Sequence, residues 1–143
     1  MYKTSAKVAE YESKLFKLSF QLRAELEYLA GKRSFQQATQ MEENLNMDQL
    51  YDALDQFGNA SKLAFEHEDI EMEAKCEAWI GKIFHKALRK ETKALSHLNS
   101  VVRLANCLRP RDVSQTEWYR ESKQALDEIR EKRRLNEEQE LER

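Results

Sequence analysis

The chain contains almost no residues that interrupt regular backbone structure. Only three Gly and one Pro occur in 143 residues, so long stretches lack the residues that most often end a helix or form a turn. Strong helix formers dominate the remainder, and no segment shows the alternation of apolar and polar residues that a half-buried strand requires. The sequence therefore predicts one all-α domain over residues 1–143, long enough to bury a core without disulfides or a structural metal.

The charges of the chain nearly cancel. It has 24 basic and 26 acidic residues, a formal net charge of -2, which is not the electrostatic footprint of a protein that binds DNA or an anionic membrane. No apolar run approaches the length of a membrane span. The two Cys residues are far apart, and no apolar signal segment lies near the N-terminus, which favours a reducing, cytoplasmic location. We therefore expect neither nucleic acid nor a membrane as a partner.

A first helix is predicted over residues 4–30. Apolar residues recur there at steps of three or four and form one face: Val8, Tyr11, Leu15, Leu18, Leu22, Leu26 and Leu29. Phe16 and Phe20 are expected to widen this face, which favours burial in a helical bundle over a two-stranded coiled coil. If the rest of the chain cannot cover the face, pairing with another helix or a second copy is expected. The candidate assembly residues are Leu15, Phe16, Leu18, Phe20 and Leu22.

The predicted boundaries of the next helices depend on capping residues. Gly31 is expected to stop the first helix, and Ser34-Phe35-Gln36-Gln37 has the form of a capping box that would start a second helix over residues 35–66. Asn44 and Asn46 favour a break within it, because their side chains compete for backbone hydrogen bonds.

The C-terminal half is predicted to contain a helical hairpin and a final helix. The hairpin spans residues 70–108, after a short acidic turn at residues 66–69. A second capping box, Ser114-Gln115-Thr116-Glu117, is expected to begin a last helix over residues 114–140, whose charged end beyond about Arg130 should project into solvent. Because the connections are short, neighbouring helices are expected to pack as antiparallel hairpins.

Part of the chain resembles the tetratricopeptide-repeat family. Ala53-x-x-x-Phe57-x-x-Ala60 is similar to the signature of a repeat's second helix, in which small residues allow a close approach and an aromatic ring fills the gap. Ile80-Gly81-x-x-Phe84 resembles the first helix of the next repeat, and Ala94-x-x-x-Leu98-x-x-Val101 resembles its second helix. The resemblance covers about residues 49–108 and implies a tetratricopeptide-like α-solenoid or bundle of about five or six helices.

The chain also departs from the family pattern. Gly81 and Ala94 are one residue farther apart than in the family, Trp79 is not at the usual Trp position, and Pro110 lies beyond the usual Pro. A generic helical bundle is therefore the alternative fold.

A basic strip is predicted on the helix over residues 70–89. At about 100° per residue, one side of this helix carries Lys75, Lys82, His85, Lys86 and Arg89, with Trp79 beside them. In tetratricopeptide repeats the first helix of each pair lines the concave groove, so the resemblance implies that this strip faces a partner. A basic groove would favour an acidic segment or a C-terminal carboxylate, whereas an ordinary solvated surface is the alternative. The family's chaperone-tail clamp also needs Asn residues at fixed groove positions, which are missing at the matching places here.

The sequence provides no signature of catalysis or metal binding. It has no CxxC, no HExxH and no Gly-rich phosphate loop, and His67, His85 and His97 are not spaced with Cys76 or Cys107 as metal ligands. We therefore expect no catalytic residue, metal or cofactor.

The predicted function is a non-catalytic protein-interaction module, either a scaffold or adaptor or a co-chaperone-like protein. One alternative is a helical bundle that homodimerises or assembles into a larger complex through its apolar N-terminal helix. The other is a helical enzyme or cofactor carrier that uses the three His and two Cys.

Overall fold

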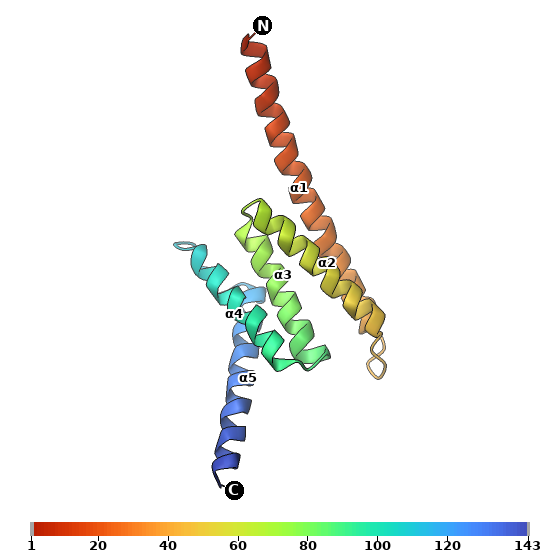
Figure 1. Ribbon diagram of the computed structural model, residues 1–143, viewed down its shortest axis with the longest axis vertical. Helices are drawn as coiled ribbons and strands as arrows, with labels where there is room; N and C mark the ends of the chain where they lie inside the picture. The colour runs from red at the N-terminus through yellow and green to blue at the C-terminus, as the bar shows by residue number, and fades with distance from the viewer. Residues whose placement is uncertain (1, 143) are drawn as a thin grey trace.

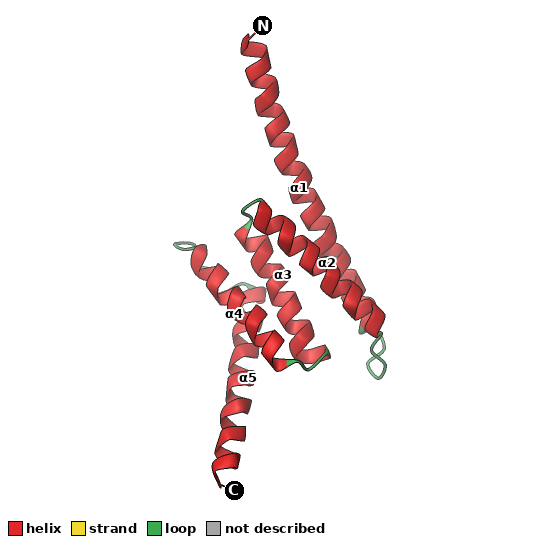
Figure 2. Ribbon diagram, viewed as in Figure 1, coloured by secondary structure: helices red, strands yellow, loops and turns green. Residues whose placement is uncertain are grey.

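The computed structural model describes the backbone of residues 2–142 and the side chains of residues 6–142. It contains five α-helices and one π-helical turn, η1, within this range: α1 (Tyr2–Ala38), α2 (Met47–Glu66), α3 (Ile70–Lys82), η1 (Ile83–Ala87), α4 (Glu91–Cys107) and α5 (Glu117–Glu142). Residues 2–142 include no strand, so the all-α prediction is confirmed (Figure 2). None of the described helices has the combination of length and apolar character needed to cross a membrane.

The helices pack in sequence order as a stack of hairpins. α1 packs against α2, and α3, continued by η1, packs against α4; α2 joins the two pairs by packing on α3, and α5 packs on both α3 and α4 (Figure 1). The N-terminal half of α1 and the C-terminal half of α5 extend beyond this body in opposite directions. The body is therefore built from the middle of the chain and the inner halves of α1 and α5.

Side-chain caps account for two of the helix starts. The side chain of Asn46 accepts a hydrogen bond from the Gln49 backbone amide before α2, and the side chain of Asp69 accepts one from the Met72 amide before α3. Each satisfies an amide that a helix N-terminus leaves without a partner. The turns between these helices lie at residues 39–46 and 67–69.

The prediction that Gly31 ends the first helix is wrong. α1 continues to Ala38, and Ser34 does not start a new helix, since its hydroxyl donates a hydrogen bond to Oε1 of Gln56 on α2 at 2.6 Å. Gly31 is buried inside α1, where a Cβ atom would lie 2.8 Å from the ring of Phe57. Without a side chain, Gly31 lets α2 approach α1 closely. A glycine at such a crossing cannot be distinguished from a helix-ending glycine by its sequence neighbours alone.

The start of the last helix also differs from the prediction. α5 begins at Glu117 rather than at residue 114. The Asp112 carboxylate accepts a hydrogen bond from the Ser114 amide at 2.9 Å, and the Thr116 hydroxyl donates to the Val113 carbonyl. Ser114 thus belongs to the turn before α5, and the predicted capping box does not form there.

The apolar face predicted for the first helix is not buried in the chain. Its seven residues, Val8 to Leu29, remain between 48% and 65% exposed. α1 instead packs through Ala24, Gly31 and Ala38, which are buried, about half a turn away from the leucines at roughly 100° per residue. Small side chains allow the backbones of two helices to come closer and pack more densely. α1 therefore packs on α2 through its small residues, although the leucine face has the larger apolar area.

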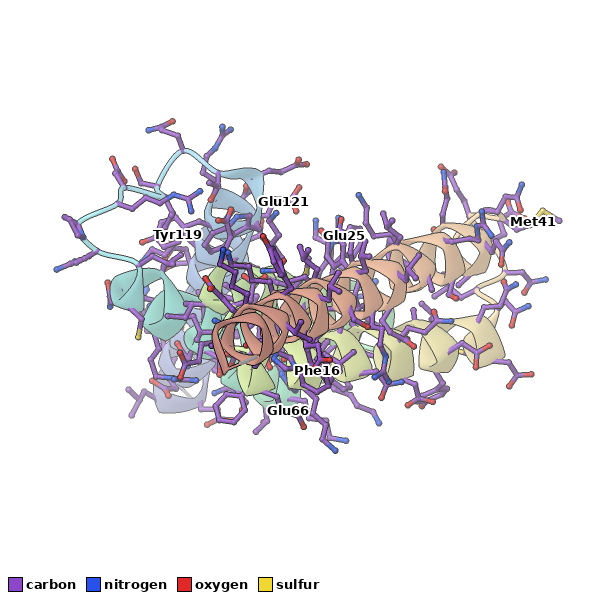
Figure 3. All side chains as sticks on the ribbon, turned by 90° about the horizontal axis from the view of Figure 1, so that it is seen from above. Phe16, Glu25, Met41, Glu66, Tyr119 and Glu121 are labelled. Carbon is purple, nitrogen blue, oxygen red and sulfur yellow. The ribbon has the colours of Figure 1, made fainter. Side chains whose placement is uncertain are left out.

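Phe16 and Phe20 do not widen the leucine face. Their rings pack edge to face with centroids 4.6 Å apart, and the Phe20 ring lies 3.8 Å from the ring of His67. Figure 3 shows Phe16 on the side of α1 where Glu66 ends α2. The candidate assembly residues are therefore divided, with Leu15, Leu18 and Leu22 on the exposed face and the two phenylalanines on the other side.

Two glycines allow equivalent helix crossings in the two hairpins. Gly31 meets Phe57 between α1 and α2, and a Cβ at Gly81 would lie 2.7 Å from Leu98 between α3 and α4. Phe57 and Leu98 are both almost fully buried. Each crossing therefore combines a residue without a side chain on the first helix with a large apolar residue on the second.

These crossings give a paired prediction for stability. Gly31→Ala and Gly58→Ala both remove a helical glycine, a change that favours the helix by about 1 kcal/mol. A Cβ at Gly58 meets no atom within 4 Å, whereas one at Gly31 collides with the buried Phe57 ring. Gly58→Ala should therefore raise the free energy of unfolding, and Gly31→Ala should be less stable than Gly58→Ala by about 1–3 kcal/mol because of overpacking. Denaturant titration measures both; equal stabilisation by the two changes would contradict the crossing.

The two cysteines should differ in reactivity. Cys76 lies in the core beside Ala60 and Met72, and this burial raises the pKa of its thiol, whereas Cys107 is exposed. The thiolate is the reactive form. One thiol should therefore react quickly with a disulfide reagent in the folded chain, and Cys107→Ser should abolish that fast reaction. Fast labelling of Cys76 without denaturant would show that this core is not packed as described.

Candidate partner-binding groove

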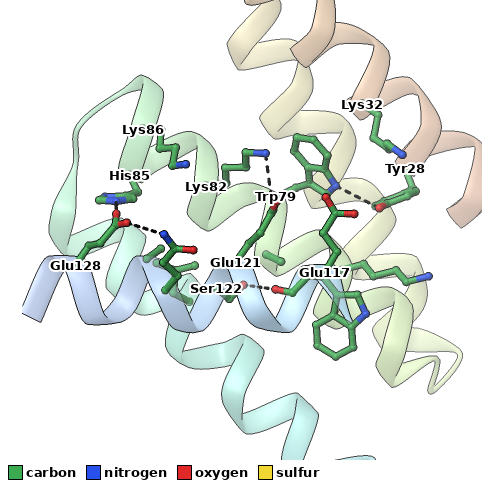
Figure 4. Close-up of a pocket in the computed structure, with 16 residues that line it drawn as sticks. Tyr28, Lys32, Trp79, Lys82, His85, Lys86, Glu117, Glu121, Ser122 and Glu128 are labelled. Atoms are coloured by element: carbon green, nitrogen blue, oxygen red, sulfur yellow. Dashed lines mark hydrogen bonds and ion pairs between the residues drawn. The ribbon is translucent and has the colours of Figure 1, made fainter. Parts of the chain in front are cut away.

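A groove of about 440 Å³ lies between the first, third and fifth α-helices (Figure 4). α1 contributes Tyr28 and Lys32, α3 and η1 form the middle, and α5 forms the opposite wall. These three helices share a side because hairpins stacked in sequence order place every second helix on the same face. Leu98 of α4 reaches the floor beneath the Gly81 crossing.

Five of the six residues predicted for a partner-binding groove line this groove. They are Lys75, Trp79, Lys82, His85 and Lys86. The sixth, Arg89, lies outside it in the turn after η1, where it is exposed and has a φ of 53°. The structure thus brings four of the five basic-strip residues to one concave surface, and the binding of a partner there stays a prediction.

Aromatic side chains form a fixed part of the groove wall. The ring nitrogen of Trp79 donates a hydrogen bond to the Tyr28 hydroxyl at 3.2 Å. The Trp79 ring stacks on Phe57 at 5.4 Å and meets Phe35 edge to face at 5.2 Å. Burial raises the pKa of Tyr28, so its hydroxyl keeps its proton. Trp79 is therefore held on three sides, with its remaining surface toward the groove.

The two walls of the groove carry opposite charges. The α5 wall has Glu117, Glu121 and Glu128, which face the lysines of α3 and η1. Lys82 lies 3.8 Å from Glu121, and His85 lies 3.3 Å from Glu128. The hydrogen bond from His85 is the main reason why the pKa of Glu128 is lowered. Part of the basic strip is therefore already paired within the chain, which the sequence did not indicate.

The lysines of the groove are consequently not equivalent. Lys82 is held by Glu121 and lies 4.7 Å above the Trp79 ring, and Lys75 lies 3.9 Å from Glu71. Within residues 6–142, Lys32 and Lys86 take part in no ion pair. Figure 4 places these two lysines toward opposite sides of the groove. Of the groove lysines, these two are therefore best able to bind a carboxylate, to which their ammonium groups would donate hydrogen bonds.

Sequence reasoning missed the contributions of α1 and α5 to this site. Tyr28, Lys32, Glu121 and Glu128 were not identified, because the first helix was expected to end near Gly31 and to use its leucine face. Trp118, the second residue of α5, also lines the groove and is half-buried. The order of antiparallel hairpins was the available signal, since it places the first, third and fifth helices together.

The described residues offer no arrangement for metal chemistry. Within them, no group of three or more His, Cys, Asp and Glu side chains is placed to hold a metal ion. His97 forms a hydrogen bond with Glu77 and stacks on Phe84. What the groove provides is a shaped surface with aromatic and charged contacts.

Comparison of the chain with protein-family models, with curated proteins and with solved structures gave no match.

The Trp79–Tyr28 hydrogen bond can be tested with a double-mutant cycle. Tyr28→Phe removes the acceptor and Trp79→Phe removes the donor while both keep an aromatic ring. Tyr28→Phe should lower the free energy of unfolding by about 0.5–1.5 kcal/mol, because the indole N–H loses its partner. The double variant should lose less stability than the sum of the single variants. Strict additivity would mean that the two side chains do not interact.

Proposed function

We propose that this chain is a non-catalytic protein-interaction module of tetratricopeptide-like helical hairpins, which binds a segment of another protein in the groove between α1, α3 and α5. The observation that carries the proposal is the position of Trp79 and the lysines of α3 and η1 on one concave surface. Such a module would act as an adaptor or scaffold, or as a co-chaperone-like protein. A cytoplasmic location fits this role.

The repeated helix crossing supports the tetratricopeptide-like part of the proposal. Each hairpin has a glycine on its first helix against a large residue on its second, Gly31 with Phe57 and Gly81 with Leu98. Small or β-branched residues flank the large residue at both crossings and are buried: Ala53 and Ala60 in α2, Ala94 and Val101 in α4. Two hairpins with the same internal packing, followed by α5, make a short solenoid with one concave side.

The chemistry of the groove defines the partner segment. The aromatic wall at Trp79 and Tyr28 suits an apolar side chain, and aromatic contacts of this kind dominate the energetics of many interfaces. Lys32 and Lys86 suit carboxylates. The glutamates of α5 would repel an acidic segment that lies along their wall, so its carboxylates should lie on the α1 and η1 sides. We therefore propose an acidic segment with at least one apolar anchor.

Intrinsic fluorescence gives a direct test, because both tryptophans of the chain, Trp79 and Trp118, line the groove. A panel of synthetic peptides with an apolar anchor and Asp or Glu should change this fluorescence on titration, and peptides with Lys in place of the acidic residues should not. Lys32→Glu/Lys86→Glu should weaken the acidic peptides by about tenfold or more, since two attractive contacts become repulsive.

Arg89→Glu is the matched control. It makes one charge reversal of the same sign, half the change in net charge of the double variant, at an exposed residue three positions from Lys86 but outside the groove, so its effect should be small and should disappear at high salt. If Arg89→Glu weakened binding as much as the double variant, the effect would come from net charge and the groove assignment would be wrong. The absence of a fluorescence change with every acidic peptide would contradict the proposed partner chemistry.

A further inference from the structure

The exposed face of α1 is a continuous apolar stripe with the spacing of a coiled-coil seam. Val8, Tyr11, Leu15, Leu18 and Leu22 follow steps of three and four residues, which are the a and d positions of a heptad. The step from Leu22 to Leu26 is again four residues, directly after the step of four from Leu18 to Leu22, and Leu26 and Leu29 then continue the stripe as in a coiled coil with a stutter. These seven residues are between 48% and 65% exposed.

The stripe is free along its whole length. The body packs on the opposite side of α1 through Ala24, Gly31 and Ala38. Toward the N-terminus, Phe20 already contacts His67, the residue after the end of α2, so α1 before Phe20 runs past the end of α2. Figure 1 shows this part of α1 with no other helix beside it. Another helix can therefore lie along the stripe without meeting α2–α5.

We propose that the stripe pairs with the same stripe of a second copy of this chain, as a parallel, in-register coiled coil of two α1 helices. The position of the charged residues beside the seam favours a second copy. With Val8 at position a, Lys7 and Lys14 occupy g positions and Glu12 occupies an e position. In a parallel pair, g faces e of the other helix, so Lys7 of each chain meets Glu12 of the other.

The opposite orientation is less favourable. In an antiparallel pair, g positions face g positions, which would bring lysines of the two chains together.

The apolar area of the stripe also agrees with a dimer. Seven half-exposed apolar side chains offer on the order of 600 Å² per chain, so two copies bury on the order of 1,200 Å², the lower range of stable interfaces. A helix that projects alone into water with such a stripe is only marginally stable.

The dimer does not depend on the groove, because no stripe residue lines it. At about 100° per residue, Lys32 lies roughly a quarter of a turn and Tyr28 roughly a third of a turn from the stripe. A partner segment could thus bind each copy in a dimer. Lys32→Glu/Lys86→Glu should leave the mass in solution unchanged, so failure of one proposal leaves the other standing.

The test uses the full chain and its mass by sedimentation equilibrium. Wild-type protein should have a mass of about 34 kDa at micromolar concentrations, twice the 17.0 kDa of one chain. Leu15→Glu/Leu18→Glu should be a 17.0 kDa monomer with an unchanged tryptophan spectrum, because neither residue packs on the body. Ser13→Glu adds a charge on the opposite side of the same helix and should remain a dimer.

A charge exchange distinguishes a second copy from any other helix. Glu12→Lys should weaken the dimer about threefold to tenfold, because two attractive contacts become repulsive. Lys7→Glu/Glu12→Lys should restore it. A concentration-independent monomer at 17.0 kDa for the wild-type chain would overturn the proposal. So would a dimer that survives Leu15→Glu/Leu18→Glu, and a dimer that the double exchange fails to restore would overturn the parallel arrangement.

Discussion

The ring of Phe57 lies against the backbone of α1 at Gly31, and the rest of the structure depends on this contact. The missing side chain at Gly31 brings α2 close to α1. The same ring stacks on Trp79 of α3 and meets Tyr28 of α1 edge to face at 5.8 Å. One buried residue of α2 therefore sets the positions of two helices that line the groove. Gly81 and Leu98 repeat the arrangement in the next hairpin and bring α4 under α3.

This packing also explains why two different sides of α1 remain accessible. The approach to Phe57 uses the small residues of α1, so its leucines remain on the outside. α5 meets α3 and α4 after the second hairpin and closes the groove with acidic residues opposite the basic strip. The groove thus has separate cations at Lys32 and Lys86, and the side of α1 away from α2 has an apolar stripe. Both surfaces follow from the choice of the glycine face for internal packing.

The sequence predicted the helical class and four of the five basic residues of the strip because both depend on local periodicity, whereas Arg89 lies after the end of η1 and outside the groove. Lys75, Lys82, His85 and Lys86 share a side of one helix wherever that helix packs. The errors arose where a choice between faces depends on distant partners. Gly31 has the local properties of a helix stop, and only Phe57 on α2 shows that it is a crossing point. The leucine face has the larger apolar area, and area alone predicts that this face is buried. It does not account for the denser packing that small residues allow between two helices. The glutamates of α5 could not be placed in the groove without the order of the hairpins.

Nuclear Overhauser contacts of the Phe57 ring test the central claim most directly. If α1, α2 and α3 meet as described, the ring protons of Phe57 should show strong contacts to the α-protons of Gly31 and clear contacts to the ring protons of Trp79. Contacts of Phe57 to Leu22, Leu26 or Leu29 in place of Gly31 would show that α1 packs through its leucine face. In that case neither the groove between α1, α3 and α5 nor the free stripe would exist.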